Sequence, residues 1–186
     1  MIGTILNAKV IGKTVSKNDP LIQSGVVVEL PDGMKGTLHV KRMNGYTPEE
    51  RAVTLSKLTE GTTVEVEVVS DTTVDGEPGF RVSQWAVLRR ARKAAAEALL
   101  ASQEVKAGEV VRLEDTYAIV RFPLISETPE GCGQGVLHVS RVAGASDEER
   151  SDNFGTITLG QSVKVQVAEV LEVHGRMRMR LGQVVA

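Results

Sequence analysis

The sequence predicts an all-β protein made of two similar five-stranded barrels joined by an α-helix. Three observations support this prediction: a long internal repeat, five strand-like segments in each copy, and strong helix formers between the copies. Gly-Thr-Leu-His-Val-Lys-Arg at residues 36–42 returns as Gly-Val-Leu-His-Val-Ser-Arg at 135–141, an offset of 99 residues. At that offset roughly 18 of 49 aligned positions are identical, which indicates two related domains. We place the first domain at 1–83, the connecting helix at 84–107 and the second domain at 108–186.

The first domain contains five segments of strand length separated by turn residues. These segments lie at 4–10, 26–30, 36–41, 64–68 and 80–82. The fourth reads Val-Glu-Val-Glu-Val, the alternation typical of a strand with one face buried. Between the third and fourth segments, Thr47 precedes a proline and two glutamates. A short helix is predicted there, because threonine caps a helix start and carboxylates favour the first turn.

The second domain repeats this order with different loops. Strands are expected at 109–114 and 117–122, followed by the repeated third strand at 135–140. The first domain has its additional residues between strands one and two. The second has them between strands two and three, at 123–134, so the insertion has moved between the copies.

The segment between the two domains has a helical pattern in place of the alternation typical of strands. Residues 85–100 are dense in strong helix formers, which predicts a helix. A stripe at helical spacing is expected to pack on at least one barrel and comprises Trp85, Leu88, Arg92, Ala95 and Leu99. The opposite face carries Arg89, Arg90 and Lys93. The composition is neither Gly/Ser-rich nor Pro-rich, so a flexible linker is not expected.

Composition and charge exclude several classes of protein. Hydrophobic residues make up 41% and charged residues 25% of the chain, without an apolar run long enough to cross a bilayer, so no membrane association is expected. A single cysteine, Cys132, and the absence of a signal-like start favour the reducing cytoplasm. Lys and Arg counted against Asp and Glu give a formal charge of −2 for residues 1–83, +3 for 84–107 and −3 for 108–186, so neither barrel is basic. Neither a metal site nor a cofactor is expected, since no motif with ligand spacing occurs.

The repeated pattern is similar to a known family. Gly-x-Leu-His-Val-x-Arg, then Gly-x-x-Val-x-Val-x-Val, then Arg-Met-Arg-Leu at 178–181 with its neighbouring residues, resembles the S-one RNA-binding motif, first described in the largest small-ribosomal-subunit protein. The resemblance covers both copies, hence nearly all the chain except residues 84–107. It implies the oligonucleotide/oligosaccharide-binding (OB) fold and binding of single-stranded RNA.

The resemblance also implies which residues contact RNA: two aromatics near strand two, a histidine of strand three and an arginine of strand five. The strand-three histidines are His39 and His138, and Arg178 matches the last-strand arginine, with Gly79 at its place in the first copy. The two aromatic positions of the family are not kept in this sequence. The strand-two position is Val27 in the first copy and Ile119 in the second, and the preceding position is Ser24 and Thr116, respectively. In the second copy Tyr117 keeps one ring, slightly displaced.

Alternation along the last strand predicts what compensates for the missing rings. If Met177, Met179 and Leu181 point inward, three arginines share the outer face. The same rule turns Tyr117, Arg121, His138 and Ser140 outward, whereas the first domain has a mixed face. The predicted RNA-contacting residues are Tyr117, Arg121, His138, Arg176, Arg178 and Arg180, with His39 and Arg81 in the first domain. We expect the second domain to supply most of the RNA affinity.

Two functions follow from these observations. The first is a non-enzymatic RNA-binding protein in translation or RNA processing, where the ribosome or RNA-processing proteins supply further contacts. The second is a protein-interaction scaffold whose barrels have lost RNA binding, which the low aromatic content of 3% favours. His39 and His138 could equally be half-buried residues that serve the fold. No combination of nucleophile and base predicts an enzyme.

Overall fold

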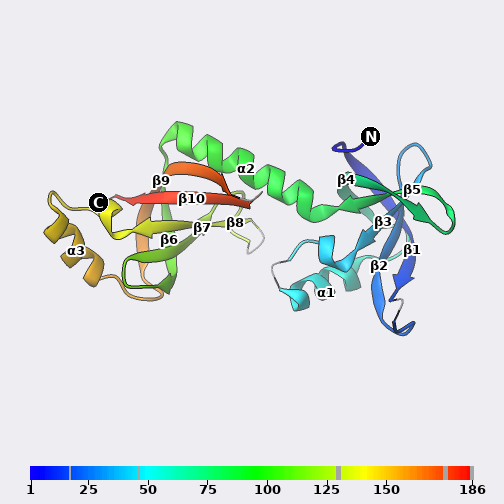
Figure 1. The fold of residues 1–186 in the computed structure, drawn as a ribbon, viewed down its shortest axis with the longest axis horizontal. Helices are drawn as coiled ribbons and strands as arrows, with labels where there is room; N and C mark the ends of the chain where they lie inside the picture. The colour runs from blue at the N-terminus through cyan, green and yellow to red at the C-terminus, as the bar shows by residue number, and fades with distance from the viewer. Residues whose placement is uncertain (17, 46, 129–130, 174–175, 185–186) are drawn as a thin grey trace. The chain divides into compact units, whose positions relative to one another are not determined.

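The computed structural model describes residues 1–186 except 17, 46, 129–130, 174–175 and 185–186. The chain divides into two compact units, Met1–Arg90 and Ala91–Ala186, each of which is described by itself. Each unit contains one closed barrel of five strands (Figure 1). The predicted fold class, two five-stranded barrels joined by an α-helix, is therefore confirmed.

The first barrel closes in the order β1-β2-β3-β5-β4, and β4 returns to pair with β1. Among the described strand pairs of this barrel, β3 and β5 run parallel and the others are antiparallel. Valines at alternate positions of the fourth strand point into the core, where Val66 and Val68 are fully buried while Glu65 is exposed. The strands are β1 (Ile5–Val15), β2 (Gln23–Glu29), β3 (Lys35–His39), β4 (Thr63–Val74) and β5 (Glu77–Ser83).

The second barrel has the same topology, closing in the order β10-β8-β7-β6-β9. Its parallel pair is β8 with β10, the counterpart of β3 with β5. Phe122, Leu137 and Leu181 are among its fully buried side chains. The strands are β6 (Val105–Leu113), β7 (Tyr117–Pro123), β8 (Cys132–His138), β9 (Ser162–Val173) and β10 (Arg176–Gln183).

A short helix follows the third strand of each barrel, as the sequence predicts. In the first barrel α1 (Pro48–Lys57) begins with a capping box, in which the Glu50 amide donates to Thr47 Oγ1 at 3.2 Å. The Thr47 amide donates in return to the Glu50 carboxylate at 3.3 Å. In the second barrel the Ser146 hydroxyl caps α3 (Asp147–Gly155), accepting from the Glu149 amide at 3.1 Å, while the Glu149 carboxylate accepts from the Ala145 amide at 2.7 Å.

Two element boundaries differ from the sequence prediction. The third strands end at His39 and His138, and the next residues form 3-10 turns, η1 (Val40–Arg42) and η2 (Val139–Arg141). Lys41 and Ser140 are therefore turn residues, and their amides donate to the Nδ1 atoms of His39 and His138. In the second unit β6 begins at Val105, within the predicted connector at 84–107.

The helix α2 (Gln84–Ser102) contributes to both units, and each part is described with its own barrel. In the first unit Ala86 is buried and Arg90 forms an ion pair with Glu67 at 3.0 Å. In the second unit Ala96 and Leu99 belong to the barrel core. The prediction that the helix packs on at least one barrel is confirmed.

Within the described part of the chain, no helix combines the length and apolarity needed to cross a membrane.

Candidate nucleic-acid interface

The outer face of β7 and β8 brings the predicted ring and imidazole together. Tyr117 and His138 are direct register partners, as are Ile119 with Val136 and Arg121 with Gln134. The rule of alternation places the first member of each pair on one face, because successive odd-numbered residues of β7 share a side. Ala118 and Val120, between them, are fully buried. This face consequently presents one phenol ring, one imidazole and one guanidinium along two adjacent strands.

The last strand, β10, adds arginines beside this surface. Met179 and Leu181 are 2% and 0% exposed, whereas Arg178 and Arg180 are exposed, as alternation predicts. Arg180 stands beside Val136 in the parallel pairing, and Arg178 lies two residues before it on the same strand. For Arg176 the structure describes only the backbone, which pairs with Val173, so the predicted role of its side chain lies outside the described part.

Glu169 changes the electrostatics of this face. The Arg180 guanidinium forms an ion pair with the Glu169 carboxylate at 2.9 Å, and the Arg141 guanidinium approaches the same carboxylate at 3.9 Å. No ion pair joins Arg121 or Arg178 to a carboxylate among the described residues. The predicted row of arginines is thus partly neutralised at Arg180 and remains cationic at Arg178.

Each strand-three histidine caps the turn that follows it. His138 Nδ1 accepts a hydrogen bond from the Ser140 amide at 3.2 Å and lies 2.9 Å from the Ser140 hydroxyl. His39 Nδ1 accepts from the Lys41 amide at 3.1 Å. A neutral ring whose Nδ1 accepts carries its proton on Nε2, which is then a donor. The histidines therefore serve the fold through Nδ1 and keep one donor for a ligand.

The two histidines differ in electrostatic environment. The pKa of His39 is lowered from its ordinary value, first by burial and then by the positive charges of Lys41 and Arg42. In the second barrel the residue at the position of Lys41 is Ser140, which is neutral. The first barrel thus places two cations, Lys41 and Arg42, beside its histidine.

The first barrel has no room for a ring at the place of Tyr117. Gly25 is the register partner of His39, as Tyr117 is of His138. A Cβ atom at Gly25 would lie 2.3 Å from the Leu38 carbonyl oxygen, so a side chain there requires the backbone to shift. Arg81 stands beside Thr37, two residues before His39, so His39 and Arg81 lie on neighbouring strands. At this position the first barrel therefore offers cations without a ring.

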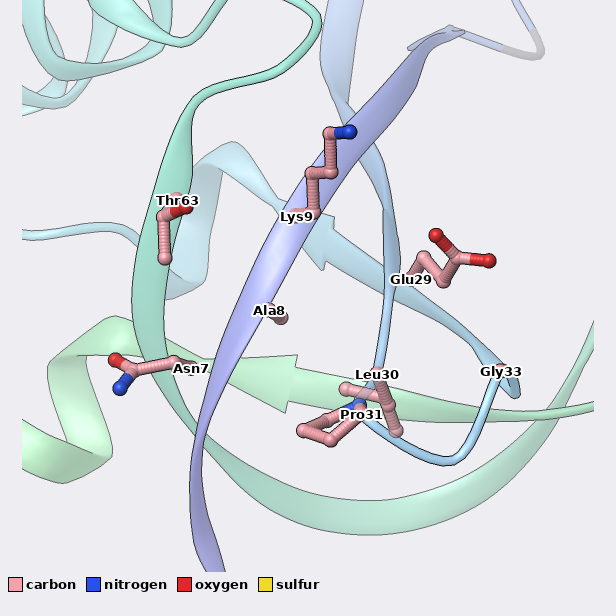
Figure 2. Close-up of a pocket in the computed structure, with 8 residues that line it drawn as sticks. All are labelled: Asn7, Ala8, Lys9, Glu29, Leu30, Pro31, Gly33 and Thr63. Carbon is pink, nitrogen blue, oxygen red and sulfur yellow. The ribbon is translucent and has the colours of Figure 1, made fainter.

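A pocket of about 450 Å³ opens elsewhere on the first barrel (Figure 2). It is bounded by β1, the turn between β2 and β3, and the start of β4, so no predicted RNA-contacting residue lines it. Figure 2 shows the Lys9 ammonium and the Glu29 carboxylate pointing in different directions. The lining residues are Asn7, Ala8, Lys9, Glu29, Leu30, Pro31, Gly33 and Thr63.

Three residues of these faces were not singled out from the sequence: Glu169, Arg141 and its counterpart Arg42. The two arginines end the repeated Gly-x-Leu-His-Val-x-Arg pattern, so the repeat itself was the signal that could have identified them. Among the described residues there is no cluster of three or more His, Cys, Asp or Glu side chains that could hold a metal ion.

A closed five-stranded barrel with this strand order defines the OB fold, so the protein is a tandem OB-fold protein. No protein-family model matches the chain, and no curated protein matches its sequence. Among solved structures, it is similar to a multidomain protein with nucleic acid binding domains from Streptococcus pneumoniae TIGR4, at 16% identity and a TM-score of 0.27. It is also similar to Drosophila Unr CSD456, at 14% identity and a TM-score of 0.27.

The matched regions cover 95% and 98% of this chain. They cover 50% of the streptococcal chain and 62% of the Drosophila chain, so this chain spans about half to three fifths of those proteins.

Proposed function

We propose that the protein binds single-stranded RNA through the outer faces of two S-one-type barrels, without catalysing a reaction. The observation that carries the proposal is the direct pairing of Tyr117 with His138 on an outer face that also presents Arg121 and Arg178. A base can stack on the phenol ring, the His138 Nε2–H can donate to a base or sugar, and the guanidinium groups can bind phosphates.

The affinity of the isolated protein is expected to be moderate. Among the described residues of this face Tyr117 supplies one ring, and stacked bases contribute about 1 to 3 kcal/mol each. Glu169 neutralises Arg180, and the formal net charge of the chain is −2. Phosphate neutralisation supplies most non-specific affinity, so few free cations mean weak binding. We therefore propose a cytoplasmic role in translation or RNA processing, in which the ribosome or an RNA-processing protein supplies further contacts.

A titration of the 186-residue chain with a fluorescently labelled single-stranded RNA tests this proposal. Fluorescence anisotropy at two salt concentrations should give a dissociation constant that weakens as salt rises. The variant Arg178→Ala should bind more weakly, whereas Lys164→Ala should bind as the unmodified chain does. Lys164 is a suitable control, because it is exposed on β9 of the same barrel and pairs with Ala107, away from β7 and β8. Absence of any RNA binding would refute the proposal.

The second candidate function is a protein-interaction scaffold. It is favoured by aliphatic side chains exposed at the end of the β1–β2 hairpin, where Leu21 is 95%, Ile22 57% and Val15 54% exposed. Such a group is costly to leave in water and is typical of a protein contact. If this function is correct, Leu21→Asp with Ile22→Asp should release co-purifying proteins, while RNA binding by the barrels should be absent.

A further inference from the structure

The second barrel carries a surface cluster of three charged side chains that identifies an anion position. The Glu169 carboxylate lies between two guanidinium groups, at 2.9 Å from Arg180 Nη1 and 3.9 Å from Arg141 Nη2. Arg180 and Glu169 are register partners on β10 and β9, and Arg141 ends the turn η2. The carboxylate thus accepts a hydrogen bond from one strand arginine and lies within ion-pair distance of one turn arginine, an arrangement of charges that also suits a phosphate.

The first barrel repeats this frame with a different residue in the place of the carboxylate. Arg81 is the register partner of Ser70, as Arg180 is of Glu169, and each pair stands 99 residues from the other. Both fourth strands carry the same irregularity just before this residue, between Val68 and Ser70 in the first barrel. The serine therefore occupies the backbone position of the glutamate.

The turn arginine is also repeated. Arg42 ends η1 as Arg141 ends η2, and both turns are capped by the preceding histidine through Nδ1, at 3.1 Å and 3.2 Å. The Ser83 hydroxyl donates to the Arg42 carbonyl at 3.3 Å and so ties this turn to β5, the strand of Arg81. The two arginine positions are consequently the same in both barrels, while the carboxylate is present in one.

The charges around this place in the first barrel favour an anion. Within the described residues neither Arg42 nor Arg81 forms an ion pair, and Lys41 adds a third cation on the same turn. Glu67 lies on the same strand as Ser70, before the irregularity, and its carboxylate is already paired with Arg90 at 3.0 Å. Asp71, next to Ser70, is the register partner of Phe80, so alternation turns it to the other side of the strand.

We propose that Arg42, Arg81 and Ser70 form an anion site on the first barrel that takes a phosphate group, in the place that the Glu169 carboxylate fills in the second. The guanidinium groups supply charge and paired donors, and the Ser70 hydroxyl supplies a third donor that a glutamate could not. The phosphate belongs either to an RNA backbone or to a free phosphate compound. In its RNA form the inference rests on the RNA-binding function proposed above.

Reciprocal exchange of the residues at the two positions tests the inference. Ser70→Glu places a carboxylate beside Arg81, and the second barrel shows that the fold accommodates it. Glu169→Ser removes the carboxylate beside Arg180. The matched control is Thr73→Glu, which adds the same charge on the same strand at an exposed position opposite Pro78.

Two probes distinguish the sources of phosphate. The first probe is inorganic phosphate, whose binding is followed by the NMR signals of the Arg42 and Arg81 Nε–H groups and the Ser70 amide. The second probe is a labelled 12-nucleotide oligouridylate, whose binding is followed by fluorescence anisotropy. In the unmodified chain phosphate should shift the Arg42 and Arg81 signals, and Ser70→Glu should abolish this shift. Ser70→Glu should also weaken oligouridylate binding about tenfold and flatten its salt dependence. Thr73→Glu should change the phosphate shifts little, while Glu169→Ser should produce similar shifts at Arg180.

The outcomes separate the two proposals. Shifts of Arg42 and Arg81 by phosphate, without oligouridylate binding, would support the anion site while refuting the RNA-binding function. Oligouridylate binding that Ser70→Glu leaves unchanged, together with arginine signals unmoved by phosphate, would overturn the anion site while leaving RNA binding intact. Equal effects of Ser70→Glu and Thr73→Glu would also overturn the anion site, because an added negative charge would then weaken binding wherever it stands on the strand.

Discussion

Tyr117 and His138 lie side by side as direct register partners on β7 and β8, and the corresponding residues of the first barrel are Gly25 and His39. The repeat thus preserves the histidine but places the ring in only one copy. A ring cannot be added at Gly25 without moving the backbone, since a Cβ there would meet the Leu38 carbonyl oxygen at 2.3 Å. The two barrels are therefore suited to different contacts: stacking in the second, and phosphate binding by cations in the first.

Loss of the Tyr117 ring should weaken RNA binding by about 1 to 3 kcal/mol, the contribution of one stacked base. The expected order of affinities is unmodified chain, then Tyr117→Phe close behind, then Tyr117→Ala well below both, because phenylalanine keeps the stacking surface. Anisotropy with a labelled oligouridylate measures these values. Circular dichroism controls for folding, and equal affinities of Tyr117→Ala and the unmodified chain would show that no base stacks there.

Arg178 and Arg180 should differ in their effect on salt dependence, although they are neighbours on the same exposed side of β10. Arg178 has no described ion pair, so Arg178→Ala should lower the slope of log affinity against log salt by about 1. Arg180 is held by Glu169 at 2.9 Å, so Arg180→Ala should change the slope less. Equal changes in the two slopes would contradict this difference, with Lys164→Ala as the charge-matched control.

The ion pair of Arg180 shows where sequence patterns stop being sufficient. Alternation along β10 correctly predicts that Met179 and Leu181 are buried and that the arginines between them are exposed. The same rule, counted along β9 from Val165 and Val167, would turn residue 169 toward the core. A bulge intervenes, because the partners of Arg180 and Leu181 are Glu169 and Val167, and it returns Glu169 to the outer face.

The ends of the third strands show a second limit of the sequence. The alternating pattern continues through Lys41 and Ser140, but the strands end at the histidines, whose Nδ1 atoms accept from the amides of these residues. A side chain that caps a turn from within a strand pattern gives no periodic signal. The helix start at Thr47, in contrast, was predictable, because its capping residue and first-turn carboxylate are adjacent in sequence.

Each barrel should unfold with its own sensitivity to core mutation, since the buried side chains form two separate clusters. Leu181 is 0% exposed in the second core, and Leu181→Ala should lower the free energy of unfolding of that barrel by about 2 to 5 kcal/mol. Val82, its counterpart in the first core, is also 0% exposed. Urea unfolding followed by NMR signals of each barrel should show Leu181→Ala acting on the second and Val82→Ala on the first. A shared shift of both transitions would contradict independent cores.

His39 should make the stability of the first barrel depend on pH. Its pKa in the folded protein is lowered by burial and by Lys41 and Arg42, so the unfolded chain binds the proton more readily. Stability is therefore fully present above the ordinary histidine pKa and is lost as pH falls through the lower folded value. Urea unfolding across this range should show the loss, and His39→Gln should reduce it.

The pKa of His39 should also respond to the proposed anion site, because a phosphate beside Arg42 brings negative charge close to the His39 ring. Bound phosphate should offset the repulsion from Lys41 and Arg42 and raise the pKa of His39 toward its ordinary value. NMR titration of the His39 ring protons, with and without inorganic phosphate, measures the change at constant ionic strength. In Ser70→Glu the carboxylate should raise this pKa without added phosphate, and phosphate should then have no further effect. A His39 pKa that neither phosphate nor Ser70→Glu alters would place the anion, if one binds, away from the turn that His39 caps.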